Sequence, residues 1–238
     1  MYQIRHIMLS GAYVLIPVAL IFFQPNLGPC LIILALWVGM LIVSGIKLRH
    51  FLALLLIFLV IFAAGWEFLL KDYQKERIMS FFVPYDPLGV SWSQNQAKIA
   101  VGTGDWLGLG VGKGSQTQYG FLSEAQTDFI FSAIAEEMGL AGIVAIMLLY
   151  LALFWRLTRI ALASQDNFSR LFVCGLTILL ACEAFVHIGV NVGLLPIIGL
   201  PLPLVSYGGS SLLATLVALG IAQAMRVSPR ADMSAVFA

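Results

Sequence analysis

Residues 51–66 read Phe-Leu-Ala-Leu-Leu-Leu-Ile-Phe-Leu-Val-Ile-Phe-Ala-Ala-Gly-Trp, a run without a single charged side chain. A helix that crosses a lipid bilayer needs about 20 mainly apolar residues in succession. Similar runs recur along the chain and predict six spans. The predicted spans are residues 7–24, 27–46, 51–70, 129–155, 170–195 and 203–226. The sequence therefore predicts an all-α integral membrane protein.

The composition agrees with this class. Hydrophobic residues make up 61% of the 238 residues and charged residues only 11%, whereas soluble domains average about 25% charged residues. The net charge of +1 provides no basic field, so no nucleic acid partner is expected. Cys30, Cys174 and Cys182 all lie in apolar runs, which predicts small buried side chains rather than disulfides or zinc ligands.

The orientation in the membrane follows from the lysines and arginines. Basic residues fall before the first predicted span, between the second and third, between the fourth and fifth, and after the sixth: Arg5, Lys47, Arg49, Arg156, Arg159, Arg170, Arg226 and Arg230. All of these lie on one side if both termini are cytoplasmic. The long stretch 71–128, between the third and fourth spans, is then an extracytoplasmic loop.

The second half of this loop is rich in aromatic residues and glycines. Trp92, Trp106 and Tyr119 are interleaved with glycines at positions 102, 104, 108, 110, 112, 114 and 120. Such a segment suits a membrane interface or a re-entrant excursion, and glycines also let backbone amides approach an anion. A flexible loop without a ligand remains an equal alternative.

The end of the loop carries two carboxylates, Glu124 and Asp128. Ser123 and Gln126 have capping-box spacing, which predicts a helix that begins near Glu124 and puts Glu124 and Asp128 on one face. Asp128 stands where the polar loop becomes an apolar helix. It can be a favourable charge at a helix N-terminus or a general base at the membrane surface.

Other charged side chains fall inside the predicted spans, where charge is costly and usually finds a partner. Glu136 and Glu137 lie about two turns after Asp128. Glu183 and His187 are spaced i, i+4 in the fifth span. This spacing favours a structural hydrogen-bonded pair over a step in a proton path.

Three motifs resemble the SEDS family (shape, elongation, division and sporulation). They are Leu200-Pro-Leu-Pro-Leu-Val-Ser-Tyr-Gly-Gly-Ser-Ser211, then Thr127-Asp-Phe-Ile-Phe131 with Ala135-Glu-Glu-Met-Gly139, and Gln24-Pro-Asn-Leu-Gly28. Three further segments resemble the elongation branch of the family, the RodA proteins, more than the division branch. These are Asp72-Tyr-Gln-Lys-Glu-Arg77, Asp86-Pro-Leu-Gly89 and Lys98-Ile-Ala-Val-Gly-Thr-Gly104.

The resemblance implies a peptidoglycan glycosyltransferase of cell elongation and cell shape that polymerises lipid II and releases undecaprenyl pyrophosphate. Asp128 matches the family's essential aspartate and is the predicted catalytic residue. Lys98 and Lys113 are candidates for contact with the diphosphate because of their charge and place. The other predicted substrate-binding residues are Glu136, Ser206, Gly208, Gly209 and Ser210. A divalent cation could share the work of neutralising the diphosphate, although the sequence contains no clear set of ligands for one.

The resemblance also implies partners and a longer architecture. The expected partners are a class B penicillin-binding protein, which crosslinks the strands, and other membrane proteins of the elongation complex. The family has about ten spans, so residues 1–238 are expected to form one SEDS-type membrane domain without the four N-terminal helices. A lipid II transporter and a non-catalytic scaffold are the alternatives. Ser123, Gln126 and His187 depart from the family's usual proline, histidine and asparagine.

Overall fold

The computed structural model describes residues 4–24, 27–68, 75, 79, 81 and 90–227. These residues form helices, turns and loops, and no strand occurs among them. Part of the predicted loop lies outside the described residues, including most of segment 72–77 and all of Asp86-Pro-Leu-Gly89. Pro25 and Asn26 of the Gln24–Gly28 motif and Arg230 also lie outside them.

Six long helices occupy the six predicted spans: α1 (Ile4–Phe23), α2 (Leu27–Val43), α3 (Leu48–Phe68), α7 (Ile130–Ala163), α8 (Asn167–Asn191) and α9 (Gly209–Val227). Three described segments are long and apolar enough to cross a membrane, namely Arg5–Phe23, Ile130–Ala163 and Asn167–Asn191. Leu27–Val43, Leu48–Val60 and Gly209–Met225 are shorter apolar helices. The all-α membrane fold is thus confirmed.

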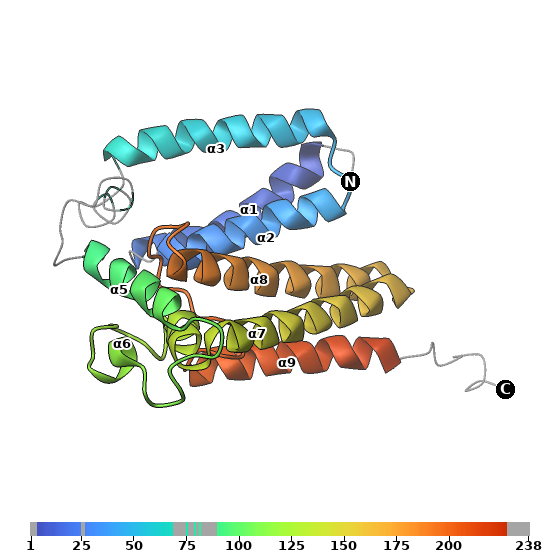
Figure 1. Ribbon diagram of the computed structural model, residues 1–238. Helices are drawn as coiled ribbons and strands as arrows, with labels where there is room; N and C mark the ends of the chain where they lie inside the picture. The colour runs from blue at the N-terminus through green and yellow to red at the C-terminus, as the bar shows by residue number, and fades with distance from the viewer. Residues whose placement is uncertain are drawn as a thin grey trace.

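The long helices alternate in direction (Figure 1). Helices α1, α3 and α8 run one way and α2, α7 and α9 run the other, so the start of α1 and the end of α9 lie at one end of the bundle. Two short helices, α5 (Val90–Thr103) and α6 (Ser115–Gln118), lie at the opposite end. This alternation agrees with the predicted grouping of the basic residues at one end of the bundle, and the side of the membrane on which that end lies stays a prediction.

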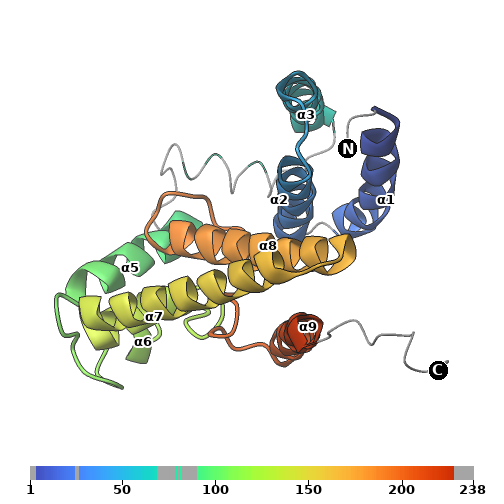
Figure 2. The same cartoon turned by 90° about the vertical axis from the view of Figure 1, so that its right-hand side faces the viewer.

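Helix α8 is the centre of the packing. It contacts α2, α5, α7 and α9, whereas α3 lies apart from α7 and α8 on the far side of α2 (Figure 2). Small residues let α2 and α8 approach closely, since a methyl group at Gly39 would lie 2.8 Å from a side-chain carbon of Ile178. Such small residues take the place of a hydrophobic driving force between membrane helices.

The boundary between α7 and α8 is set by a cap. The carboxylate of Asp166 accepts a hydrogen bond from the backbone N–H of Ser169 at 2.8 Å, which satisfies one of the free donors of the first turn. This hydrogen bond lowers the pKa of the Asp166 carboxyl. Because Asp166 starts α8 directly after α7 ends at Ala163, the two helices pack as an antiparallel hairpin.

Helix α7 is interrupted at Gly139, which has φ 63° and ψ −161°. Only glycine adopts such a conformation without strain. The backbone groups that the break releases bond to the loop instead, because Leu140 N–H donates to Asp105 O at 2.9 Å and Leu109 N–H donates to Glu136 O at 2.9 Å. The loop and the first turns of α7 therefore form one unit.

The predicted helix start near Glu124 is wrong. Residues 123–129 form turns, Glu124 has a positive φ of 51°, and α7 begins at Ile130. The hydroxyl of Ser123 lies 2.9 Å from that of Ser93 instead of capping a helix. Contacts with α5 and α8 determine the conformation of residues 123–129. The capping-box spacing therefore does not start a helix here.

Candidate functional site

Asp128 lies in the turn directly before α7, two residues before the first helical residue. Its side chain is half-buried and lies beside Gly199, where an added methyl group would be 3.5 Å from Asp128 Oδ2. Together with His187 and Val190 of α8, these residues line a small hollow. The carboxylate thus faces a space bordered by the segment that follows α8.

The two long motifs meet at Asp128. The Ser206 hydroxyl donates to Thr127 O at 2.8 Å and accepts from the Leu202 N–H at 2.7 Å. The Tyr207 N–H donates to Gln126 O at 2.9 Å. The backbone on the N-terminal side of Asp128 is therefore held by the segment between α8 and α9.

Asn191 holds the other side of Asp128. It is fully buried, and its Nδ2 donates to Asp128 O at 3.0 Å and to His187 O at 2.8 Å. Its Oδ1 accepts from both the N–H and the hydroxyl of Ser132, at 3.1 and 2.7 Å. A single amide thus joins the last turn of α8 to the first turn of α7.

The predicted hydrogen-bonded pair of Glu183 and His187 is wrong. The His187 ring turns to the segment after α8, where its Nδ1 lies 2.8 Å from Leu200 O. Since a carbonyl only accepts, Nδ1 carries the proton. His187 is 1% exposed, and its Nε2 has no hydrogen-bond partner among the described residues. Glu183 makes no hydrogen bond in the described part of the chain, so the two side chains are not paired.

Glu136 of α7 binds the loop through its side-chain carboxylate. It is fully buried, and its oxygens accept four hydrogen bonds from Ser115 Oγ, Gln116 N–H, Thr117 N–H and Thr117 Oγ1, at 2.7–3.2 Å. A carboxylate so engaged fixes the start of α6. Its predicted contact with substrate stays a prediction.

The remaining predicted substrate residues are distributed around this end of the bundle. Lys98 is exposed on α5, and its side chain packs against Gly193 just after α8. Lys113 is exposed in the loop and packs against Gly110. Gly208 precedes α9, and Gly209 and Ser210 form its exposed first residues, whose amides lack partners within the helix.

Sequence reasoning missed Asn191, Ser132 and Gly199 as parts of this site. Asn191 follows His187 by one helical turn at the end of an apolar helix, and a buried amide at that place was the available signal. The sequence left open whether a divalent cation takes part. Among the described residues, no group of three or more His, Cys, Asp or Glu residues could hold one.

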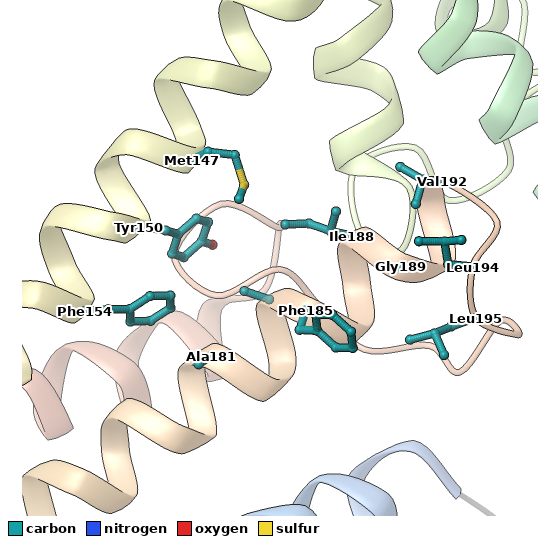
Figure 3. A pocket seen from close by; sticks show the side chains of 11 residues that line it. Met147, Tyr150, Phe154, Ala181, Phe185, Ile188, Gly189, Val192, Leu194 and Leu195 are labelled. Atoms are coloured by element: carbon teal, nitrogen blue, oxygen red, sulfur yellow. The ribbon is translucent and has the colours of Figure 1, made fainter.

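A second hollow lies on another face of α8. This apolar cavity of about 350 Å³ lies between α7 and α8 (Figure 3). Tyr150 and Phe154 enter it from α7, and Phe185 and Ile188 line it from α8. Because its lining is almost wholly hydrocarbon, it suits an acyl or isoprenoid chain rather than a polar group.

Comparison with known proteins shows one family. The family of cell cycle proteins that comprises FtsW, RodA and SpoVE matches residues 2–230. The peptidoglycan glycosyltransferase MrdB of Escherichia coli (strain K12) is 39% identical over 209 residues, which cover 87% of this chain and 56% of that protein. The probable peptidoglycan glycosyltransferase FtsW of Geobacter sp. (strain M18) is 40% identical over 207 residues, covering 86% and 55%. The chain thus spans about half the length of the curated relatives it matches.

Two solved structures share the fold. A structure of a peptidoglycan synthase complex that coordinates polymerization and crosslinking matches with a TM-score of 0.79 and 32% identity, over 95% of this chain and 64% of that one. The crystal structure of the Thermus thermophilus rod shape determining protein RodA matches with a TM-score of 0.63 and 29% identity, over 97% and 59%.

Proposed function

Because this chain belongs to the SEDS family of multi-pass proteins of the cytoplasmic membrane, we propose that it takes part in polymerising lipid II into peptidoglycan glycan strands. The observation that carries the proposal is the position of Asp128. A half-buried carboxylate lies beside Gly199 while its backbone is held on both sides by partly buried hydrogen bonds. Such fixation is what a general base requires, since misplacement of a catalytic group costs rate.

The proposed reaction is an inverting glycosyl transfer. The carboxylate of Asp128 accepts the proton of the acceptor sugar's hydroxyl, and the hydroxyl oxygen attacks the anomeric carbon of the donor. A new glycosidic C–O bond forms on one face while the bond to undecaprenyl pyrophosphate breaks on the other. A general base typically contributes about 10²–10⁴-fold to the rate.

The leaving diphosphate needs positive charge or hydrogen-bond donors. We propose that Lys98 contributes, since it is exposed at the same end of α8 as Asn191 and the Asp128 turn. Lys113, Ser210 and the backbone of Gly208 and Gly209 are the further candidates. Glu136 is proposed to act through the loop, because its oxygens are occupied by Ser115–Thr117.

The similarity to a peptidoglycan synthase complex supports a partner that crosslinks the strands. We propose a class B penicillin-binding protein for this role. We propose an elongation function from the Lys98–Gly104 segment and from the similarity to the rod shape determining protein RodA, although the FtsW and MrdB relatives are about equally identical to this chain. The names of these relatives favour a transferase over a lipid II transporter or a scaffold.

The decisive experiment uses a complete protein that carries this segment, together with its penicillin-binding partner. Conversion of lipid II to polymer is measured for Asp128→Asn and for the matched control Glu124→Gln, four residues away in the same turn. Asparagine keeps the size but cannot accept a proton at neutral pH. We expect a loss of about 10²-fold or more for Asp128→Asn and near-normal activity for the control. Polymerisation by Asp128→Asn at the control's rate would overturn the proposal.

We also propose that the loop 71–128 faces outside the cytoplasm. Gln118 of α6 and Gln165 between α7 and α8 are both exposed, at opposite ends of the bundle. Cysteine at position 118 should react with an impermeant thiol reagent in spheroplasts, and cysteine at position 165 only after lysis. The reverse pattern would invert the assignment.

A further inference from the structure

The segment that joins α5 to α6 exposes a dense set of apolar side chains. The exposed fractions are 71% for Trp106, 81% for Leu107, 45% for Leu109 and 79% for Val111. Apolar surface costs about 25 cal/mol per Å² when it faces water, and clustered exposure usually marks a contact surface. The position of this segment relative to α7 indicates what covers these apolar side chains.

The segment is tied to α7 at the Gly139 break. Four backbone hydrogen bonds join them: Leu109 N–H to Glu136 O, Gly110 N–H to Glu137 O, Leu140 N–H to Asp105 O and Ala141 N–H to Trp106 O, at 2.9–3.1 Å. Close approach depends on glycines, since a methyl group at Gly108 would collide with the backbone at Glu137. Along the long axis of the bundle, residues 105–111 therefore lie at the same level as residue 139 of α7.

That level can be derived from the packing of α7 on α8. Leu157 and Ile160 of α7 share a cluster with Val173 and Leu176 of α8. In an antiparallel pair the two chains advance at the same 1.5 Å per residue. Continued from this cluster, the register brings the end of α8 opposite about residue 142 of α7.

The observed partner of Asn191, however, is Ser132, about ten residues before the position that this register requires. Residues 130–138 thus do not continue the axis of the span. The break at Gly139 turns them across the end of the bundle, so that Ser132 stays level with the end of α8.

The part of α7 that spans then begins at residue 140 and ends near Arg156 and Arg159, which gives about 24–30 Å of helix. The hydrocarbon core of a bilayer is about 30 Å thick. Gly139, and with it residues 105–111, therefore lies where the hydrocarbon ends. Met138, Leu140 and Val144 of α7 are also exposed, at 47%, 40% and 46%, so the apolar surface of the span continues onto the segment.

We propose that residues Trp106–Val111 lie in the membrane–water interface at the end of the bundle where Asp128 is found, with Leu107 and Val111 immersed in lipid. Tryptophan is enriched at this depth because its ring is apolar and its N–H is polar. Lys113, exposed two residues further on, can extend its ammonium group to the head groups. The segment anchors the loop, and through Glu136 and the first turns of α7 it sets the height of Asp128 above the lipid.

The test uses a nitroxide spin label in the full protein reconstituted in phosphatidylcholine–phosphatidylglycerol nanodiscs. The label is attached at Leu107→Cys and, as a matched control, at Gln118→Cys, which is exposed in the same loop but on α6, outside the apolar segment Trp106–Val111. The native cysteines are buried or half-buried within the helices. Collision rates with oxygen, which concentrates in lipid, and with a neutral nickel chelate, which stays in water, are compared.

We expect the ratio of oxygen to nickel accessibility to be severalfold higher at position 107 than at position 118. Equal ratios, with both labels open to the nickel chelate, would overturn the proposal. So would low accessibility to both reagents at position 107, because that result would mean that protein, such as a second copy, covers the segment. Since no substrate or partner is present, the outcome is independent of the proposed enzymatic activity.

Discussion

The hydroxyl of Ser206 donates a hydrogen bond to the carbonyl oxygen of Thr127 at 2.8 Å, across 79 residues of sequence. The hydroxyl oxygen of Ser206 also accepts a hydrogen bond from the N–H of Leu202, so one side chain closes the turn after α8 and attaches it to the residue before Asp128. The serine of the Ser-Tyr-Gly-Gly-Ser run thus has an identifiable physical task. It positions the backbone of the carboxylate.

Replacement of Ser206 by alanine should weaken this attachment. Leaving polar groups without partners costs about 1–3 kcal/mol, and each 1.4 kcal/mol lost from the transition state lowers the rate about tenfold. We expect Ser206→Ala to reduce polymerisation by about tenfold, measured as initial rate with purified complete protein. Ser211→Ala is the control, because no hydrogen bond of the Ser211 side chain is found among the described residues. Equal rates for the two variants would contradict a positioning role for Ser206.

Asn191 offers a second test of how Asp128 is held. Asn191→Asp keeps the shape and the acceptor for Ser132 but loses the Nδ2 donor to the carbonyl groups of Asp128 and His187. It also brings a carboxylate next to two carbonyl oxygens. We expect kcat to fall by about tenfold or more with a smaller change in KM, since the substrate does not touch this buried amide. Asn95→Asp, exposed on α5, is the control.

A change in KM alone would contradict this role, because it would place Asn191 in substrate binding rather than in the alignment of the base. Thermal unfolding of the same samples separates alignment from stability. Only variants that still unfold in one cooperative thermal transition are used for the comparison of kcat and KM.

The sequence predicted the six helices well, because each run of about 20 apolar residues has one stable solution in lipid. It also singled out Asp128 as the candidate base, since a carboxylate at the border of a polar loop and an apolar helix is conspicuous, and the catalytic role of Asp128 stays a prediction. It failed where tertiary contacts override local spacing. Glu183 and His187 have the spacing of a pair, yet the His187 ring bonds to Leu200, which no local pattern reveals.

The break at Gly139 illustrates the same limit. Residues 129–155 were predicted as one span, and the glycine within it is compatible with a continuous helix that merely loses about 1 kcal/mol. The turn across the bundle arises because the 105–110 segment supplies replacement hydrogen bonds. These partners lie about thirty residues away in the chain, beyond the reach of periodicity arguments.

His187 should tolerate a change that preserves its donor. The Nδ1–H of the ring bonds to Leu200 O, while Nε2 makes no hydrogen bond among the described residues. Asparagine can supply an N–H, so His187→Asn should retain activity and melting temperature. His187→Leu should be less stable by about 1–3 kcal/mol, because it leaves a buried carbonyl unpaired. Complete loss of polymerisation in a well-folded His187→Asn protein would mean that Nε2 has a catalytic role.

The adjacent carboxylates Glu136 and Glu137 provide a matched pair for the last prediction. Glu136 is fully buried and accepts four hydrogen bonds from residues 115–117, whereas Glu137 is half-buried and accepts one long bond of 3.3 Å from the exposed Gln118. Of these two side chains, Glu136 therefore contributes most to holding residues 115–117 in place.

Glu136→Gln converts one acceptor oxygen into an NH₂ group that faces two donors, so the turn at residues 114–118 should open more often. The tryptic site after Lys113 lies at the start of this turn, and Gly114 packs directly on the Glu136 carboxylate. When cleavage is slow relative to closing, its rate follows the open population, which rises about tenfold for each 1.4 kcal/mol lost. We expect Glu136→Gln to be cut after Lys113 at least tenfold faster than the native protein and Glu137→Gln at nearly the native rate.

Equal cleavage of the two variants would contradict the structural role of Glu136. A loss of polymerisation in Glu136→Gln without faster cleavage would point to direct contact with the substrate instead.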